Sequence, residues 1–307
     1  MSTLYDHLAW TTHAIPSHAA TGHVELHVGE VGDGDRVATL VAGVHGDEGP
    51  WGALAVQRLL ARPLDTLQGR LRVVLAANPL ALEADARNAP LDHLDLNRSF
   101  PGNSRGSHTE VLAYTLRRVI AGSSLVADLH GGGSWCVNAF AFSFPGDEDL
   151  AAEVGAPFTV AAPGTKGTLT DDARSGGARV VALEMGGRSR DEFRWRDRIA
   201  DGLTRVLQHQ EFLTESGVVP APTSVPVGAT AVLRPRVGGV FIPTLREDKV
   251  GTVVAGGTEL GRLLHPHTLR LLETFDAPFE RTALLLLRPH VCVLEGGAMT
   301  YVVAEPR

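Results

Sequence analysis

The segment VATLVAGVHGDEGPWGALAVQRLLA (residues 37–61) decides the fold class, because it reads as a strand, a turn and a helix in succession. Residues 37–44 are uniformly apolar and rich in β-branched side chains, as expected of a strand that is covered on both faces. Residues 51–61 place apolar side chains at helical spacing. A doubly covered strand followed by a helix predicts an α/β fold with parallel strands.

The same alternation continues to about residue 213. We expect further buried strands and helices, the strands at 71–79, 124–130 and 178–186 and the helices at 107–122 and 191–213. Strands separated by helices predict a mixed, largely parallel sheet that is flanked by helices.

The composition changes near residue 216, where three prolines within seven residues predict a linker. Beyond it, short β-like runs are punctuated by glycine, as in GGVFIPTL (238–245) and TYVVAE (300–305). We therefore predict two domains, an α/β domain over residues 1–218 and an all-β domain over residues 228–307. A length of 307 residues agrees with two domains.

Composition excludes several classes of protein. A net charge of −7 argues against a nucleic-acid binder, which would carry a clustered basic face. No apolar run approaches the roughly 20 residues of a membrane helix, and the first ten residues do not resemble a secretory signal. Two cysteines do not build a disulfide framework and fit a reducing compartment, so we expect a soluble cytoplasmic protein. A homo-oligomer is compatible with the sequence, which does not determine the oligomeric state.

The chain has 13 histidines, of which His45 stands out by its position. His45 and Glu48 lie just past the first strong strand, and the carboxyl ends of parallel strands are where open sheets bind ligands. The spacing alone is weak support for a metal site, since a second H-x-x-E pair, His27 and Glu30, occurs in a probable β-segment.

A second strand-end histidine, His130, closes the strand 124–130 and is followed by three glycines. It can reach the same crevice as His45. Two imidazoles and one carboxylate, with one position left open, are the ligand set of a hydrolytic zinc site. Asp128 shares a face with His130 in a regular strand, so it either orients a histidine or simply closes the strand.

A hydrolytic zinc needs a base. Glu184 ends another apolar strand and has no charged neighbour in VALEMGG, which is uncommon for a purely structural glutamate. It is suited to accept a proton from the attacking water and to pass that proton to the leaving amine.

Candidate substrate contacts lie between residues 87 and 98. Asn97 and Arg98 provide an amide and a planar guanidinium that match a substrate carboxylate, although Arg98 could equally pair with Asp95. Arg87 could polarise the scissile carbonyl or, taken alone, simply lie on the surface.

Six short motifs together, in their order, resemble the succinylglutamate desuccinylase/aspartoacylase family of the zinc carboxypeptidase superfamily. They are GVHGDEG (43–49), NP (78–79), Arg87, DLNRSFPG (95–102), DLH (128–130) and LEMGG (183–187). The resemblance implies a zinc-carboxypeptidase-like fold in residues 1–218 and one Zn²⁺ per chain.

The resemblance also implies the role of each matching residue. It implies zinc ligation by His45, Glu48 and His130. It implies a carboxylate-binding pair in Asn97 and Arg98, a carbonyl-polarising Arg87 and a catalytic Glu184. Aspartoacylase-like members have a further substrate-contacting arginine ten residues before the glutamate, which falls on Arg174, although the glycine-rich segment ARSGGAR (173–179) could also be only a mobile loop.

The chain departs from the family in two places. Gly131 replaces the small polar residue that often follows the third ligand, so any contact from that loop would come from backbone N–H groups or Ser134. Tyr301 is the one tyrosine beyond the linker, and no further motif aligns it with the C-terminal tyrosine of some members.

The C-terminal part resembles a biotinyl/lipoyl-like barrel over residues 238–264. The lysine that would carry a prosthetic group is absent from the expected turn at 276–283, so we expect a barrel-sandwich-like structural cover.

Together these features predict a zinc-dependent amidohydrolase that cleaves the amide bond of an N-acylated amino acid or of a similar small carboxylate-bearing amide. A metallocarboxypeptidase acting on peptides is the alternative within the same chemistry. A non-catalytic small-molecule-binding protein of the same fold is the alternative from another class. The sequence identifies neither the acyl group nor the amino acid.

Overall fold

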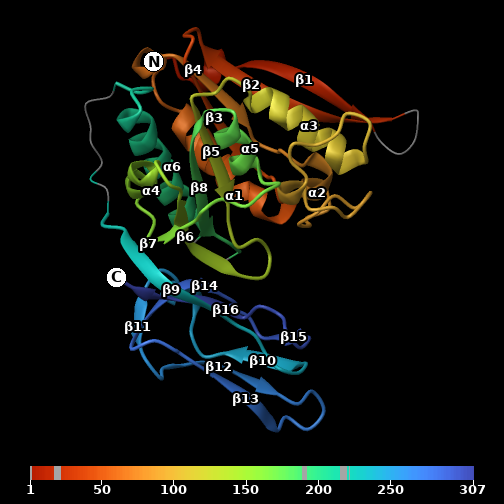
Figure 1. The fold of residues 1–307 in the computed structure, drawn as a ribbon, viewed down its shortest axis with the longest axis vertical. Coiled ribbons are helices and arrows are strands. Elements are labelled where there is room, and N and C mark those ends of the chain that lie inside the picture. The colour runs from red at the N-terminus through yellow and green to blue at the C-terminus, as the bar shows by residue number, and fades with distance from the viewer. Residues whose placement is uncertain (1, 17–21, 189–191, 215–219, 221) are drawn as a thin grey trace.

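The computed structural model describes residues 2–16, 22–188, 192–214, 220 and 222–307. Figure 1 shows an upper part in which helices surround a sheet and a lower part made of strands. No helix in the described part of the chain is long and apolar enough to cross a membrane.

Four parallel strands form the centre of the upper part. Their order across the sheet is β4 (Arg70–Val74), β3 (Val37–Ala42), β5 (Leu125–His130) and β8 (Arg179–Gly186). β1 (Ala9–Pro16) and β2 (His23–Gly32) add an antiparallel edge beyond β4. The predicted α/β class with a mixed sheet is confirmed.

Helices cover both faces of this sheet because alternate residues of each strand point to opposite sides. Leu40 of β3 joins the core beneath α1 (Gly49–Leu60), α4 (Glu148–Val154) and α6 (Glu192–His209). Val41 joins the core beneath α3 (His108–Ile120) and α5 (Leu169–Ser175). A capping box of Ser107 and Glu110 begins α3.

The structure differs from the predicted elements at some boundaries. The strand expected over 71–79 ends at Val74, because Asn78 caps a short helix, α2 (Pro79–Glu83), and proline suits the first turn of a helix. α6 ends at His209 rather than at residue 213. β6 (Val137–Ser143) and β7 (Phe158–Ala161) have no counterpart among the predicted strands.

The C-terminal strands form two layers. β9 (Val225–Leu233), β16 (Tyr301–Pro306), β14 (Arg281–Leu287) and β11 (Val253–Ala255) extend the main sheet beyond β7. β13 (Leu271–Asp276), β12 (Glu259–Leu264), β10 (Gly239–Pro243) and β15 (Cys292–Leu294) form a second sheet in that order. The rings of Phe241 and Tyr301, 6.1 Å apart, connect the two layers.

The upper and lower parts share hydrogen-bonded strands. β6 pairs with β8, with β7 and also with β14, so that β6, β7, β9, β16 and β14 close a barrel of strands. The predicted boundary at residue 218 lies outside the described residues. The division into two domains and the finer barrel-sandwich comparison stay predictions.

Two glycines shape the turn between β3 and α1. Gly43 has a φ of +74°, which glycine adopts without the steric cost of a Cβ. Gly46 packs against the backbone of α2, and a Cβ at this position would lie 2.0 Å from the carbonyl carbon of Ala81. The turn that carries His45 therefore depends on the absence of a side chain at residue 46.

We expect Gly46→Ala to lower the midpoint of thermal unfolding by several degrees, because forcing an extra methyl into a packed site costs about 1–3 kcal/mol. Gly228→Ala is the matched control, since a Cβ there meets its neighbours at 3.5 Å or more. Circular dichroism would measure both midpoints. Equal midpoints for the two variants would contradict the packing argument.

Candidate active site

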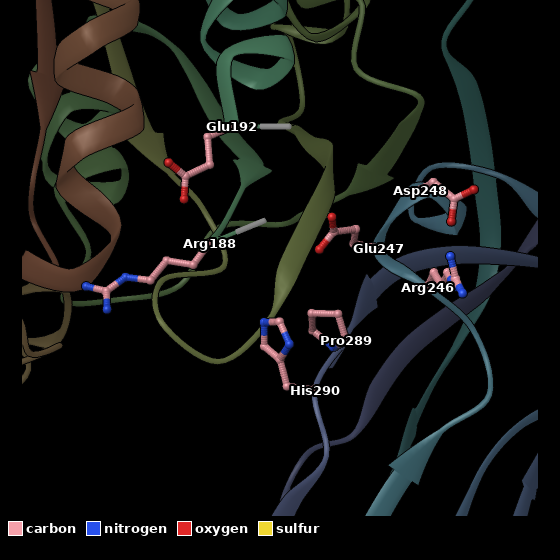
Figure 2. A pocket seen from close by; sticks show the side chains of 7 residues that line it. All are labelled: Arg188, Glu192, Arg246, Glu247, Asp248, Pro289 and His290. Atoms are coloured by element: carbon pink, nitrogen blue, oxygen red, sulfur yellow. The ribbon is translucent and has the colours of Figure 1, made fainter. Parts of the chain in front are cut away.

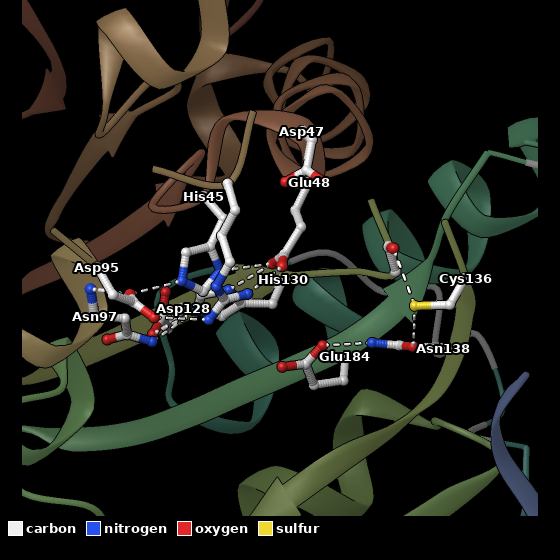
Figure 3. A network of polar contacts seen from close by, with 12 residues as sticks. His45, Asp47, Glu48, Asp95, Asn97, Asp128, His130, Cys136, Asn138 and Glu184 are labelled. Atoms are coloured by element: carbon white, nitrogen blue, oxygen red, sulfur yellow. Dashed lines mark hydrogen bonds and ion pairs between the residues drawn. The ribbon is translucent and has the colours of Figure 1, made fainter. Parts of the chain in front are cut away.

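Two imidazoles and one carboxylate meet at the carboxyl edge of β3 and β5 (Figure 3). His45 follows β3, a 3₁₀ turn (Gly46–Glu48) places Glu48, and His130 is the last residue of β5. Nδ1 of His45 lies 3.0 Å and Nδ1 of His130 lies 2.9 Å from Oε2 of Glu48. All three ligand atoms lie within 4.8 Å of one another, as a single bound ion requires.

The other nitrogen of each imidazole faces a second carboxylate. Nε2 of His45 lies 3.1 Å from Oδ1 of Asp95, and Nε2 of His130 lies 3.0 Å from Oδ2 of Asp128. When each Nε2 carries the proton, both Nδ1 atoms are left with lone pairs that point inward. Carboxylates commonly orient metal-binding histidines in this way.

The cluster fits a divalent metal ion. All three residues are buried, and Nδ1 of His45 has no hydrogen-bond partner of suitable geometry among the described residues. Burial opposes protonation of His130, but the charges of Asp128 and Glu48 outweigh it and raise the pKa of His130 well above its usual range. The surroundings thus favour positive charge, and two nitrogens with one oxygen suit zinc.

Glu184 lies beside the cluster on β8, where it pairs in register with His130 of β5. Burial raises the pKa of the Glu184 carboxyl to about 7, and the negative charge of Glu48 adds to that increase. Nδ2 of Asn138 donates a hydrogen bond of 2.7 Å to Oε2 of Glu184. A carboxyl group with a pKa near neutrality is suited to accept and return a proton.

Arg87 connects the cluster to the following loop. Its guanidinium donates to Oε1 of Glu48 at 3.1 Å and to Oδ2 of Asp95 at 2.9 Å. The Arg87 side chain is 47% exposed, so Arg87 extends from the buried Glu48 to the solvent. Asp95 therefore pairs with Arg87 and His45, whereas Arg98 donates to the backbone oxygen of Asn97 at 2.6 Å.

A cavity of about 160 Å³ adjoins the cluster and gathers most of the predicted site residues. Its lining includes the predicted residues His45, Arg87, Asn97, Arg98, His130 and Glu184, together with Asp128, Phe142, Phe144, Thr168 and Thr170. Oδ1 of Asn97 accepts a hydrogen bond of 2.9 Å from the N–H of Leu169 at the start of α5. This bond leaves the amide nitrogen of Asn97 on the side of His130.

Two other candidates lie elsewhere. Arg174 is part of α5 rather than of a loop; its guanidinium donates to the backbone oxygen of Pro145 at 3.0 Å and lies over the ring of Phe144. Arg174 thus contacts a residue of the cavity wall without lining the cavity itself, and its role in substrate binding stays a prediction. Tyr301 is fully buried between the C-terminal sheets and donates to the backbone oxygen of Leu260.

A larger hollow of about 700 Å³ lies between the upper part and the C-terminal strands (Figure 2). Arg188 and Glu192 line it from one side, and Arg246 and His290 from the other. None of the predicted metal or substrate residues lines it.

The sequence did not predict Asn138, nor Phe142 and Phe144 of the cavity wall. Asn138 is a buried amide inside the otherwise apolar strand β6, and a buried polar residue in such a run requires a hydrogen-bond partner. That signal was present in VNAFAF (137–142), but the sequence does not show which residue the partner is.

Comparison with known proteins identifies relatives of the chain. The sequence model of the succinylglutamate desuccinylase/aspartoacylase catalytic domain matches residues 34–210. An N-α-acetyl-L-2,4-diaminobutyric acid deacetylase from Halomonas elongata is 42% identical over 118 residues. That match covers 38% of this chain and only 34% of the deacetylase.

Solved structures show the same fold over nearly the whole chain. A succinylglutamate desuccinylase from Silicibacter sp. TM1040 superimposes with a TM-score of 0.84 at 23% identity, covering 98% of this chain and 95% of that one. The ectoine utilization protein EutE (DoeB) from Ruegeria pomeroyi gives a TM-score of 0.83 at 23% identity, covering 97% and 95%.

We expect His45→Ala to weaken metal binding at least about a hundred-fold, because changing even an outer partner of a metal ligand costs 10- to 100-fold. Inductively coupled plasma mass spectrometry, after incubation with ZnCl₂ and desalting, would measure the zinc content of each variant. His27→Ala, which alters the exposed histidine of the second H-x-x-E pair, is the matched control and should retain the metal. Equal metal content in both variants would contradict the assignment of the cluster.

Proposed function

Because the chain belongs to the succinylglutamate desuccinylase/aspartoacylase family, we propose that it is a zinc-dependent hydrolase that removes the acyl group from a small N-acyl amino acid. The observation that carries this proposal is the buried cluster of His45, Glu48 and His130 beside Glu184 at a small cavity. The resemblance of part of the chain to a diaminobutyric acid deacetylase supports the same reaction class.

His45, Glu48 and His130 would hold the zinc ion. When bound, zinc would supply Lewis-acid polarisation of the amide carbonyl and would lower the pKa of water. Asp95 and Asp128 keep the two imidazoles oriented with Nδ1 toward Glu48, so that both Nδ1 atoms would be available to the ion.

Glu184 acts as the general base and then as the general acid. Its carboxylate accepts a proton from the attacking water, and it passes that proton to the leaving nitrogen when the amide bond breaks. Burial places its pKa at about 7, so it can exist in either protonation state at neutral pH.

Arg87 stabilises the negative charge that develops on the carbonyl oxygen. Its guanidinium already lies against Glu48 and extends toward the cavity, so it needs little rearrangement to reach the substrate.

Arg98 and Asn97 bind the carboxylate of the amino acid at the cavity wall. A cavity of about 160 Å³ suits a small amide rather than a peptide. This size favours deacylation over carboxypeptidase activity.

We expect the zinc-loaded protein to hydrolyse N-acyl amino acids. We expect Glu184→Gln to reduce kcat at least about a hundred-fold with its zinc content unchanged, because general-base catalysis contributes 10²- to 10⁴-fold. The rates of hydrolysis of N-acetyl amino acids, N-succinyl amino acids and tripeptides would be compared, each with and without a chelator. Glu280→Gln, on the exposed surface, is the control. Chelator-insensitive turnover, or full activity of Glu184→Gln, would contradict the mechanism.

We expect Arg98→Ala to raise KM for carboxylate-bearing substrates about ten- to a hundred-fold with a smaller effect on kcat, because a hydrogen bond to a charged group contributes about 1.5–3 kcal/mol. Steady-state kinetics would separate the two constants. Arg105→Ala, on an exposed neighbouring turn, should leave KM unchanged. An unchanged KM in Arg98→Ala would contradict carboxylate binding by Arg98.

A further inference from the structure

Asn138 is a buried amide that the family motifs do not include. It lies on β6 with its backbone between two strands: it pairs with Gly186 of β8 on one side and with Leu286 of β14 on the other. The residue is 5% exposed, so its side-chain amide needs partners inside the protein.

The amide reaches the proposed base across the β6–β8 pair. Phe140 stands opposite Glu184 in the register, so Asn138, two residues earlier, is the diagonal neighbour of Glu184 on the same face. Nδ2 of Asn138 donates to Oε2 of Glu184 at 2.7 Å (Figure 3). An ionised carboxylate only accepts hydrogen bonds, so the orientation of the amide follows from this contact.

The rest of the amide is also enclosed. Oδ1 of Asn138 lies 3.6 Å from the thiol sulfur of Cys136, which has a shorter contact, of 3.0 Å, with the backbone oxygen of Gly132. Among the residues that the structure describes, Asn138 is the hydrogen-bond donor to the Glu184 side chain. One carboxylate oxygen is therefore held by Asn138, and Oε1 is left for proton transfer.

We propose that Asn138 is the positioning residue for Glu184: its amide holds Oε2 so that Oε1 faces the reacting water and the leaving nitrogen. The proposal rests on the proposed function, in which Glu184 moves the proton. No covalent step involves Asn138, which acts through Glu184 alone.

This role connects the C-terminal strands to the chemistry. Leu286 and Leu287 of β14 pair with Asn138 and Val137, so β14 supports the part of β6 that carries the amide. The guanidinium of Arg288 lies 4.4 Å from the ring centre of Trp135, in the loop before β6. The C-terminal strands thus hold both the strand and the loop that place Asn138.

The test compares two variants. Asn138→Leu keeps the approximate shape of the side chain and removes the donor. Cys136→Ser keeps a donor of similar size next to Asn138. For Asn138→Leu we expect kcat to fall about ten- to a hundred-fold, with KM within about twofold and zinc content unchanged. Cys136→Ser should keep the wild-type kcat. This pattern is the reverse of that expected for Arg98→Ala, in which KM changes.

A crystal structure of the zinc-loaded Asn138→Leu protein provides a second measurement. We expect the Glu184 carboxylate to be rotated from its wild-type position while His45, Glu48 and His130 stay in place. If Asn138→Leu does not fold, Asn138→Ala removes the donor without adding bulk, and the same results are expected for it.

A folded, zinc-loaded variant with wild-type kcat, or with an unmoved Glu184 carboxylate, would overturn the assignment of Asn138. Failure of the proposed function has a different signature: the wild-type protein would hydrolyse no N-acyl amino acid. In that case the position of the Glu184 carboxylate in the two crystal structures still decides whether Asn138 holds it.

Discussion

The contact of two imidazoles with one buried carboxylate is the constraint on which the rest of the site depends. Oε2 of Glu48 lies about equally close to Nδ1 of His45 and of His130, and each opposite nitrogen meets a further carboxylate. Such a concentration of acceptors inside a protein favours a cation at its centre. The turn after β3, the end of β5 and the loop that carries Asp95 all serve to bring these groups together.

The C-terminal strands belong to this arrangement as well. They continue the main sheet through β9 and return to β6 through β14, so that residues after 280 support a strand beside the proposed base. A closed circuit of strands resists displacement better than a free edge, because each backbone is paired on both sides. The C-terminal segment, which contains none of the proposed metal ligands, therefore pairs with the strand that carries Asn138.

The sequence predicted the elements with strong local patterns and missed those without them. The strand and helix of residues 37–61 were predicted because their apolar spacing is local. His45, Glu48 and His130 were proposed as ligands because they lie at the ends of such strands, and the structure brings the three together. β7 was missed because a strand of four residues carries little periodicity, and β6 was missed because the polar Asn138 interrupts its apolar run. The end of β4 was placed wrongly, since Pro79 reads as a stop but in fact begins α2.

The α/β class, the family and the residue types of the proposed zinc site were thus predictable from the sequence, because hydrophobic periodicity and motif order are properties of the chain. The side-chain partners follow from the tertiary structure instead. Asp95 pairs with Arg87 rather than with Arg98, the guanidinium of Arg174 lies over the ring of Phe144, and Asn138 donates to Glu184. These contacts join segments 8 to 46 residues apart through strand register and loop packing. Side-chain pairing of this kind follows from three-dimensional packing and leaves no periodic trace in the sequence.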